Sequence, residues 1–238
     1  MQAVAALPIQ SPLATRLSRL AALGDADMAA IAAAEREQRR WQARREILGE
    51  GEPIRERRAI LSGWACRQRI LPDGQRQILG FLLPGDLIGM CRHPSPIAPT
   101  SIMAVGEVIT CPVPDERSRS GNLATAYALG GALDEYYMLA QVTRLGRMTA
   151  AERLLDWVLE TYDRLALVDL ASDDRMPAPI TQEFLADTLG LTSVHINRTL
   201  NALRREGLLT SSSGTIGIID RVRLAKMVGY QPARVTGG

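Results

Sequence analysis

The chain has few cysteines and only two histidines, and this scarcity excludes several classes of protein. Cys66, Cys91 and Cys111 form no CxxC pair and no cluster able to hold an iron–sulfur centre. Beside His93 and His195 there is no nucleophile–base pattern, phosphate loop or paired metal-ligand motif. The sequence therefore predicts no catalytic residue, no cofactor and no metal ligand, and we expect a protein that is not an enzyme.

Long hydrophobic runs are also lacking. No stretch of 18 apolar residues occurs, and the N-terminal segment has no basic-then-apolar pattern of a secretory signal. An odd number of scattered thiols is typical of a reducing compartment. We therefore expect a cytoplasmic protein without a membrane partner, and its 238 residues suffice for two domains with cores.

Excess charge is small overall but unevenly distributed. The net charge of the whole chain is only +2. From Ala178 onward, however, seven basic residues stand against four acidic ones, so this segment carries +3 and the rest of the chain −1. A modest basic surface near the C-terminus is compatible with nucleic-acid binding.

The most specific pattern in the chain lies between Ile180 and Leu209. Thr181 is a candidate N-cap for a first helix, and Gly190 is suited to a tight bend because glycine tolerates positive φ. Thr192 or Ser193 can cap a second helix. The second helix has an apolar stripe formed by Ile196, Leu200 and Leu203. The spacing of this stripe from the bend, and of the bend from the small Ala186, is that of a helix-turn-helix. The alternative is a helical hairpin inside a larger core.

The predicted second helix leaves hydrogen-bonding and basic residues outside its apolar stripe. Arginine reads guanine and asparagine reads adenine in the major groove, whereas basic residues at the far end can meet phosphates. Strand patterns at Leu208–Thr210 and Thr215–Ile219, around a turn at Ser211–Gly214, predict a β-wing, and Arg221–Val228 predicts a short helix. The predicted DNA-binding residues are Thr192, Ser193, Val194, His195, Asn197, Arg198, Asn201, Arg204 and Arg205.

The N-terminal half changes from helical to strand-like patterns. Leu13–Ala34 predicts two helices separated at Gly24-Asp25, and residues 40–114 predict short strands of a small barrel or sandwich. Ile60–Leu71 and Gln75–Leu83 flank Pro72-Asp73-Gly74, a hairpin signal. Gly63 and Gly80 inside these runs indicate bulges or close backbone approach. Ser101–Val113 predicts a further strand pair or one bent strand.

A long helix is predicted from Leu123 to Gly146, with two apolar faces. One face has coiled-coil spacing and consists of Leu123, Ala126, Gly130, Leu133, Tyr137 and Ala140. The other consists of Leu129, Ala132, Tyr136 and Leu139. We expect this helix to pack on the barrel with one face and on a second subunit with the other, and we favour this over burial of both faces in one monomer.

A capping box at Thr149–Glu152 starts the next predicted helix, Ala150–Leu167. The polar segment Asp169–Pro179 after it predicts a loop.

Three segments resemble the CRP/FNR family of bacterial transcription regulators: GWACRQRILPDGQRQILGFLLPGDLIG (63–89), RMTAAERLLDWVLE (147–160) and LADTLGLTSVHINRTLNALRREGLL (185–209). The resemblance implies an α+β fold. It consists of a β-barrel of the cyclic-nucleotide-binding, double-stranded β-helix type (13–120), a dimerisation helix (121–147) and a winged helix-turn-helix (148–238). It also implies a homodimer on a palindromic double-stranded DNA operator, with RNA polymerase as a partner. Arg198 matches a base-contacting arginine of the family, whereas Val194 stands where many members carry a glutamate.

The sensor loop, PGDLIGMCRHPSPIAPTSIMAV (84–105), departs from members that bind cyclic nucleotides. It has no Gly-Glu-Leu motif and no arginine between His93 and Ser101, leaving Arg92 as the nearby candidate for the phosphate. We therefore predict no useful affinity for cAMP or cGMP. Cys91 and His93 could ligate heme or a metal, but we favour a loop cysteine and an exposed histidine. We expect Cys66 to serve packing.

The sequence thus predicts a sequence-specific DNA-binding transcription regulator, responding through its barrel to an unknown effector. The alternative is a ligand- or heme-sensing or protein-interaction module whose winged helix docks protein. Salt separates the two, because DNA binding weakens steeply as ions compete for phosphates.

Overall fold

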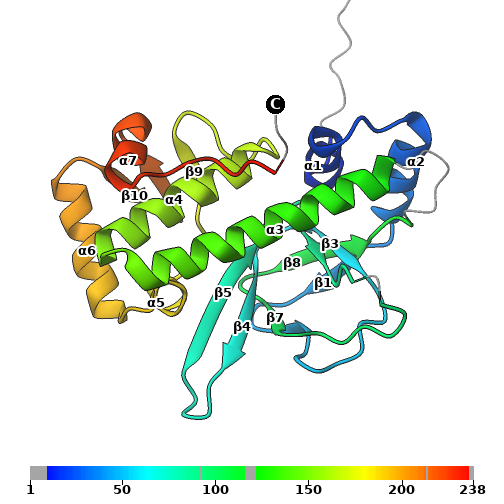
Figure 1. Cartoon of the computed structure of the whole chain (residues 1–238), viewed down its shortest axis with the longest axis horizontal. Coiled ribbons are helices and arrows are strands. Elements are labelled where there is room, and N and C mark those ends of the chain that lie inside the picture. The colour runs from blue at the N-terminus through cyan, green and yellow to red at the C-terminus, as the bar shows by residue number, and fades with distance from the viewer. Residues whose placement is uncertain (1–9, 92, 116–121, 213, 236–238) are drawn as a thin grey trace, which may run out of the picture.

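The chain begins with two short helices that lie beside the start of a long one (Figure 1). The computed structural model describes residues 10–91, 93–115, 122–212 and 214–235. Helix α1 (Pro12–Leu20) is capped by Ser11, whose hydroxyl accepts from Ala14 N–H at 3.0 Å. Helix α2 (Asp25–Ala34) follows Gly24, so the predicted break is confirmed.

The described strands that follow form two antiparallel four-stranded sheets, confirming the predicted β-barrel domain. One sheet has the order β1-β8-β3-β6 and the other β2-β7-β4-β5. Apolar side chains of both sheets form a core between them, including Ile60, Leu82 and Val108. The strands are β1 (Arg39–Trp41), β2 (Glu46–Leu48), β3 (Arg58–Ser62), β4 (Ala65–Ile70), β5 (Arg76–Leu82), β6 (Leu87–Ile88), β7 (Ser101–Ala104) and β8 (Val108–Pro112).

The predicted hairpin around residues 72–74 is present, but the run expected before it is two strands. Strands β3 and β4 belong to different sheets, and the chain turns between them at Gly63. This residue has φ +78°, and a Cβ there would lie 2.0 Å from the Glu107 carbonyl oxygen, so only glycine fits. Gly80 lies at a bulge, because Arg67 pairs with Gly80 while the next residue pairs with Ile78. Both glycines therefore have the roles expected of them.

Helix α3 (Asn122–Arg147) crosses the molecule from α1 and α2 to the C-terminal half (Figure 1). Leu123, Ala126 and Tyr127 on one of its faces are buried against the N-terminal half. Helix α4 (Ala150–Ala166) starts at the predicted capping box, where Thr149 N–H donates to Glu152 Oε2 at 2.7 Å. No helix in the described part of the chain is long and apolar enough to cross a membrane.

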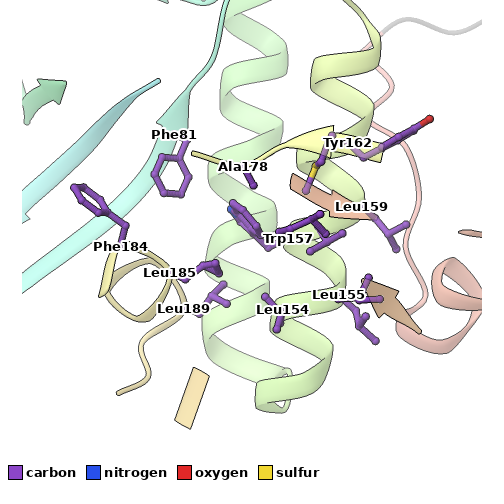
Figure 2. Packing of buried hydrophobic residues seen from close by; sticks show 14 of the residues in the cluster. Phe81, Leu154, Leu155, Trp157, Leu159, Tyr162, Ala178, Phe184, Leu185 and Leu189 are labelled. Atoms are coloured by element: carbon purple, nitrogen blue, oxygen red, sulfur yellow. The ribbon is translucent and has the colours of Figure 1, made fainter. Parts of the chain in front are cut away.

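A continuous hydrophobic core joins the barrel to the C-terminal half. Figure 2 shows Phe81 of β5 facing Trp157 of α4, with ring centroids 5.9 Å apart in an edge-to-face arrangement. Phe184, Leu185 and Leu189 pack beside them (Figure 2). Because these rings come from separate parts of the sequence, the two halves are packed as one body.

The C-terminal half contains the predicted helix-turn-helix and wing, and one strand that was not expected. The prediction of a loop over Asp169–Pro179 is wrong at Arg175–Pro177, which form β9 and pair with β11. Met176 is buried there, and the edge position tolerates Pro177. The remaining elements are α5 (Gln182–Leu189), α6 (Ser193–Arg205), β10 (Leu209–Ser212), β11 (Thr215–Ile218) and α7 (Arg221–Val228).

Candidate nucleic-acid interface

Local capping fixes the bend between α5 and α6. Thr181 Oγ1 accepts from Phe184 N–H, and Thr192 Oγ1 accepts from His195 N–H at 3.2 Å, so both helices begin at hydroxyl caps. Gly190 ends α5 with φ +62°, and its N–H donates to the Ala186 carbonyl. The glycine and the two caps have the positions predicted from the sequence.

Helix α6 separates buried and exposed residues cleanly. Its buried side consists of Ile196, Thr199, Leu200 and Leu203. The opposite side is exposed, and Val194 in its first turn is 70% exposed. Thr192 and Ser193, at the start of the helix, are exposed as well. The structure therefore brings most predicted contact residues to one surface, formed by Val194, Asn197, Arg198, Asn201, Arg204 and Arg205.

His195 is the exception, because it lies on the flank of α6. Its side chain is half-buried and lines a cavity of about 500 Å³ together with the start of α4 and the end of α7. Thr149 and Met227 lie on the other walls of this cavity. The sequence pattern excluded His195 from the apolar stripe but could not show that α4 and α7 lie beside it.

A chain of hydrogen bonds orders the polar side chains of α6. Asn201 Nδ2 donates to Asn197 Oδ1 at 2.9 Å, and Asn197 Nδ2 donates to Gln182 Oε1 at 3.2 Å. At the other end Arg204 donates to Asn201 Oδ1 at 3.1 Å and to the Ser211 hydroxyl of the wing. Gln182 and Ser211 were not predicted as site residues, since their role depends on contacts across the motif.

Arg198 differs from its neighbours in having no hydrogen-bond or ion-pair partner among the described residues. It is exposed on the same side as Asn201 and Arg205. Arg205 Nε donates to the Asn201 carbonyl at 3.3 Å. Arginine carries five donors in a planar fork, so Arg198 has its full set available for a ligand.

Comparison with known proteins assigns the chain to a family. Residues 38–119 match the cyclic nucleotide-binding domain, and residues 152–227 match the Crp-like helix-turn-helix domain. The chain is 33% identical over 179 residues to the nitrogen fixation regulation protein FixK of Bradyrhizobium diazoefficiens, covering 69% of this chain and 70% of FixK. The chain belongs to the CRP/FNR family of transcription regulators. It is therefore a DNA-binding regulator and not an enzyme.

Other relatives of this CRP/FNR regulator agree. The transcriptional activatory protein AadR of Rhodopseudomonas palustris is 29% identical over 77% of this chain and 78% of its own length. Among solved structures, FixK2 from Bradyrhizobium japonicum aligns with a TM-score of 0.69 and 27% identity, covering 84% of this chain and 98% of FixK2.

The barrel of this regulator leaves little space where it faces α3. The void there measures about 30 Å³, enough for roughly two water molecules. Arg67 of β4 and Asp134 of α3 line it and form an ion pair at 2.9 Å. Arg92, the predicted candidate for a cyclic phosphate, lies outside the described residues. The expectation that cAMP has no useful affinity stays a prediction.

The cysteines of the regulator differ in environment. Burial raises the pKa of the Cys66 and Cys111 thiols to about 12, so both are neutral near pH 7 and unreactive. Cys91 is exposed, whereas the neighbouring His93 accepts from Ser95 N–H at 3.1 Å through its Nδ1. The described residues contain no group of three or more His, Cys, Asp or Glu that could hold a metal.

Proposed function

We propose that this regulator acts as a homodimer that binds a palindromic DNA operator, with one α6 helix in each half-site and RNA polymerase as a partner. The observation that carries the proposal is the exposed side of α6, where Arg198, Asn197 and Asn201 gather opposite the buried stripe. A major groove admits an α-helix, and these are residue types that read base edges there.

The free face of α3 supports the dimer. Leu139 and Val142, three residues apart on this helix, are 62% and 66% exposed. Large apolar residues exposed together on a long helix indicate an interface. Because the opposite face of α3 is already packed on its own chain, a second α3 is the partner that would cover these residues. Two-fold pairing also matches the way in which helix-turn-helix proteins bind two half-sites.

Contacts between the barrel and α5 support control by an effector. Arg76 at the start of β5 pairs with Asp187 at 2.6 Å and with Glu183 at 3.2 Å, and its guanidinium lies 4.4 Å from the Phe184 ring centroid. Gln77 Nε2 donates to the Asp187 carbonyl at 2.9 Å. A shift of the β4–β5 hairpin therefore moves α5 directly. We propose that an effector changes the balance between DNA-competent and incompetent dimers through these contacts.

The salt dependence of DNA binding tests the proposal against protein docking by the winged helix. Operator affinity, measured by fluorescence anisotropy at several salt concentrations, should fall steeply as salt rises. Each phosphate contact contributes about −0.9 to the slope of log K against log[salt]. Arg204→Ala with Arg205→Ala should flatten that slope by about two contacts. Arg36→Ala, an exposed arginine of the N-terminal half, is the matched control. A salt-independent affinity would contradict DNA as the partner.

A further inference from the structure

A large cavity lies between the two halves of the molecule, away from α6, and Tyr137 of α3 separates it from the filled space beside the barrel. Its volume is about 610 Å³, within the range of roughly 300–1,000 Å³ typical of small-molecule sites. Helices α1 and α3 line one side, and α4, α7 and the C-terminal segment line the other. The C-terminal segment passes from α7 along α4 toward α1 (Figure 1). A molecule in this cavity would therefore touch both halves at once.

Two tyrosines hold the C-terminal segment over the cavity. Tyr230 Oη donates to Asp163 Oδ2 of α4 at 2.8 Å. Tyr136 Oη of α3 donates to the Gln231 carbonyl at 3.0 Å. The same segment is thus tied to α4 of one half and to α3 of the other, and it forms a wall of the cavity.

The walls combine apolar surface with arginines. Leu20, Leu133 and Leu167 supply aliphatic surface, and Tyr137 and Tyr162 supply rings. Four arginines line the cavity against a single carboxylate, that of Asp163; they are Arg16, Arg19, Arg221 and Arg234. Sites for small molecules have this composition, with a mostly apolar lining and a few polar groups that fix orientation.

The pairing of the arginines defines the charge that a ligand should carry. Arg16 pairs with the buried Asp86, and Arg221 with Asp163, so these two charges are neutralised. Arg19 donates to the Ala166 carbonyl at 2.9 Å and pairs at 2.8 Å with Asp169, but that ion pair is solvent-exposed and worth little. Arg234 has no ion-pair partner among the described residues. One unmatched positive charge and one arginine in a weak, exposed ion pair line the same cavity, which suits a single anionic group.

We propose that this cavity binds a small organic monoanion, a carboxylate attached to an apolar body, and that this molecule acts as the effector. The carboxylate would lie at Arg19 and Arg234, displacing Asp169, and the apolar body against Leu133 and Leu167. Its role as effector rests on the proposed function. A ligand that contacts both halves stabilises one arrangement of the two, and this changes operator affinity only if DNA binding depends on that arrangement.

Calorimetric titration of the full chain without DNA tests the site. The ligands are decanoate and 2-naphthoate, which distinguish an acyl body from an aromatic one, each compared with its neutral analogue, decanol or 2-naphthamide. At least one carboxylate should bind saturably, with one molecule per chain, and about tenfold or more tightly than its neutral analogue. No saturable binding, or equal binding of the neutral analogue, would overturn the site.

Variants locate the binding within the cavity. Arg19→Gln combined with Arg234→Gln should weaken carboxylate binding by about tenfold or more, whereas the exposed Arg36→Gln, which does not line the cavity, should leave it unchanged. Bound carboxylate should also slow amide hydrogen exchange in residues 229–235 but not in the wing, residues 209–218. An unchanged affinity in the double variant, or protection confined to other segments, would place the ligand elsewhere.

The effector role is measured separately. Saturating carboxylate should shift operator affinity by about fivefold or more in either direction. Binding without such a shift would overturn the effector role and leave the site standing. A protein that binds the carboxylate but no DNA under any condition would instead contradict the proposed function.

Discussion

At the scale of single residues, the decisive side chains are those whose surroundings are specific to one position. Gly190 has a left-handed φ at the bend, Arg198 is exposed without a partner among the described residues, and Asp86 is buried between two arginines. The sequence predicted the bend at Gly190 and the outward position of Arg198 on the second helix, because glycine positions and helical spacing are local signals. It could not predict the third, since Asp86 and Arg164 are 78 residues apart and meet only in the folded chain.

Arg198→Ala should weaken operator binding by about 1–3 kcal/mol and relax specificity at one base pair. The reason is that Arg198 has no hydrogen-bond or ion-pair partner in the part of the chain that the structure describes, so its donors are available to a base. Anisotropy titrations on the operator and on single-base variants measure both effects. An unchanged affinity and base preference would mean that α6 is not the reading helix.

Gly190→Ala should destabilise the protein by about 1–2 kcal/mol, because an alanine in the left-handed region brings its Cβ close to the following carbonyl. That Cβ would also lie 3.3 Å from a methyl of Leu145 on α3. Gly131→Ala is the control, since Gly131 lies within α3 with no atom near its Cβ position. There alanine should stabilise by up to about 1 kcal/mol. Urea unfolding of both variants gives the comparison.

Asp86 should give stability a dependence on acid. Burial alone would raise the pKa of this carboxyl, but Arg16, Arg164 and the Leu83 N–H outweigh it and hold the pKa below its usual range. Because the folded pKa lies below the unfolded one, the stabilisation is complete above about pH 4 and is lost as pH falls through the folded pKa.

Asp86→Asn should therefore unfold more easily at pH 7, by about 3–5 kcal/mol, since it leaves buried guanidinium groups without their carboxylate. The loss should shrink as pH falls below about 4, because the Asp86 carboxyl of the unfolded wild type is then protonated, and it should vanish once pH is below the folded pKa as well. Asp73→Asn, an exposed turn residue, controls for the change of charge. An equal loss at pH 3 and pH 7 would contradict this origin of the stability.

At the scale of elements, α3 and the β4–β5 hairpin connect the barrel to the winged helix-turn-helix. The sequence predicted both elements and the two apolar faces of α3. It did not predict that Arg76 of the hairpin would meet α5, or that β9 would complete the wing sheet. A three-residue strand containing a proline has too little pattern to be recognised, and the hairpin contact joins residues more than 100 positions apart.

Leu139→Glu should convert the dimer to monomers by placing a charge in the apolar face of α3, and operator affinity should fall with it. Val222→Glu on α7 is a matched control, because that valine is even more exposed, at 82%, but lies on another helix. Analytical ultracentrifugation reports the mass of each variant. A Leu139→Glu protein that remains dimeric would place the interface elsewhere.

Arg76→Ala should loosen the attachment of the hairpin to α5, because it removes two ion pairs and the contact with the Phe184 ring. Amide exchange should accelerate in residues 76–82 and 182–189. Arg69→Ala changes an exposed arginine of the same hairpin, which pairs with Glu50 and donates to the Pro99 carbonyl, and should leave α5 unaffected. Equal exchange in both variants would show that the Arg76 contacts do not hold α5.

At the scale of the whole molecule, the layout of barrel, long helix and winged helix-turn-helix could be predicted from sequence because each part has its own period and punctuation. The side-chain contacts that hold these parts together could not be predicted from the sequence. The network in which Arg144 binds Asp156 and Glu160, while Arg164 binds Glu160 and Asp86, exists only once α3, α4 and the barrel have met. The same is true of the cavity that the C-terminal segment lines on one side.

The most direct test of the central claim, that two α6 helices of a symmetric dimer read one duplex, is a hydroxyl-radical footprint on DNA selected by the purified protein. We expect two protected segments related by two-fold symmetry, with centres about one helical turn, or roughly 34–36 Å, apart on one face of the duplex. A single protected segment without a symmetric counterpart, or a footprint that Arg198→Ala leaves intact, would contradict the account.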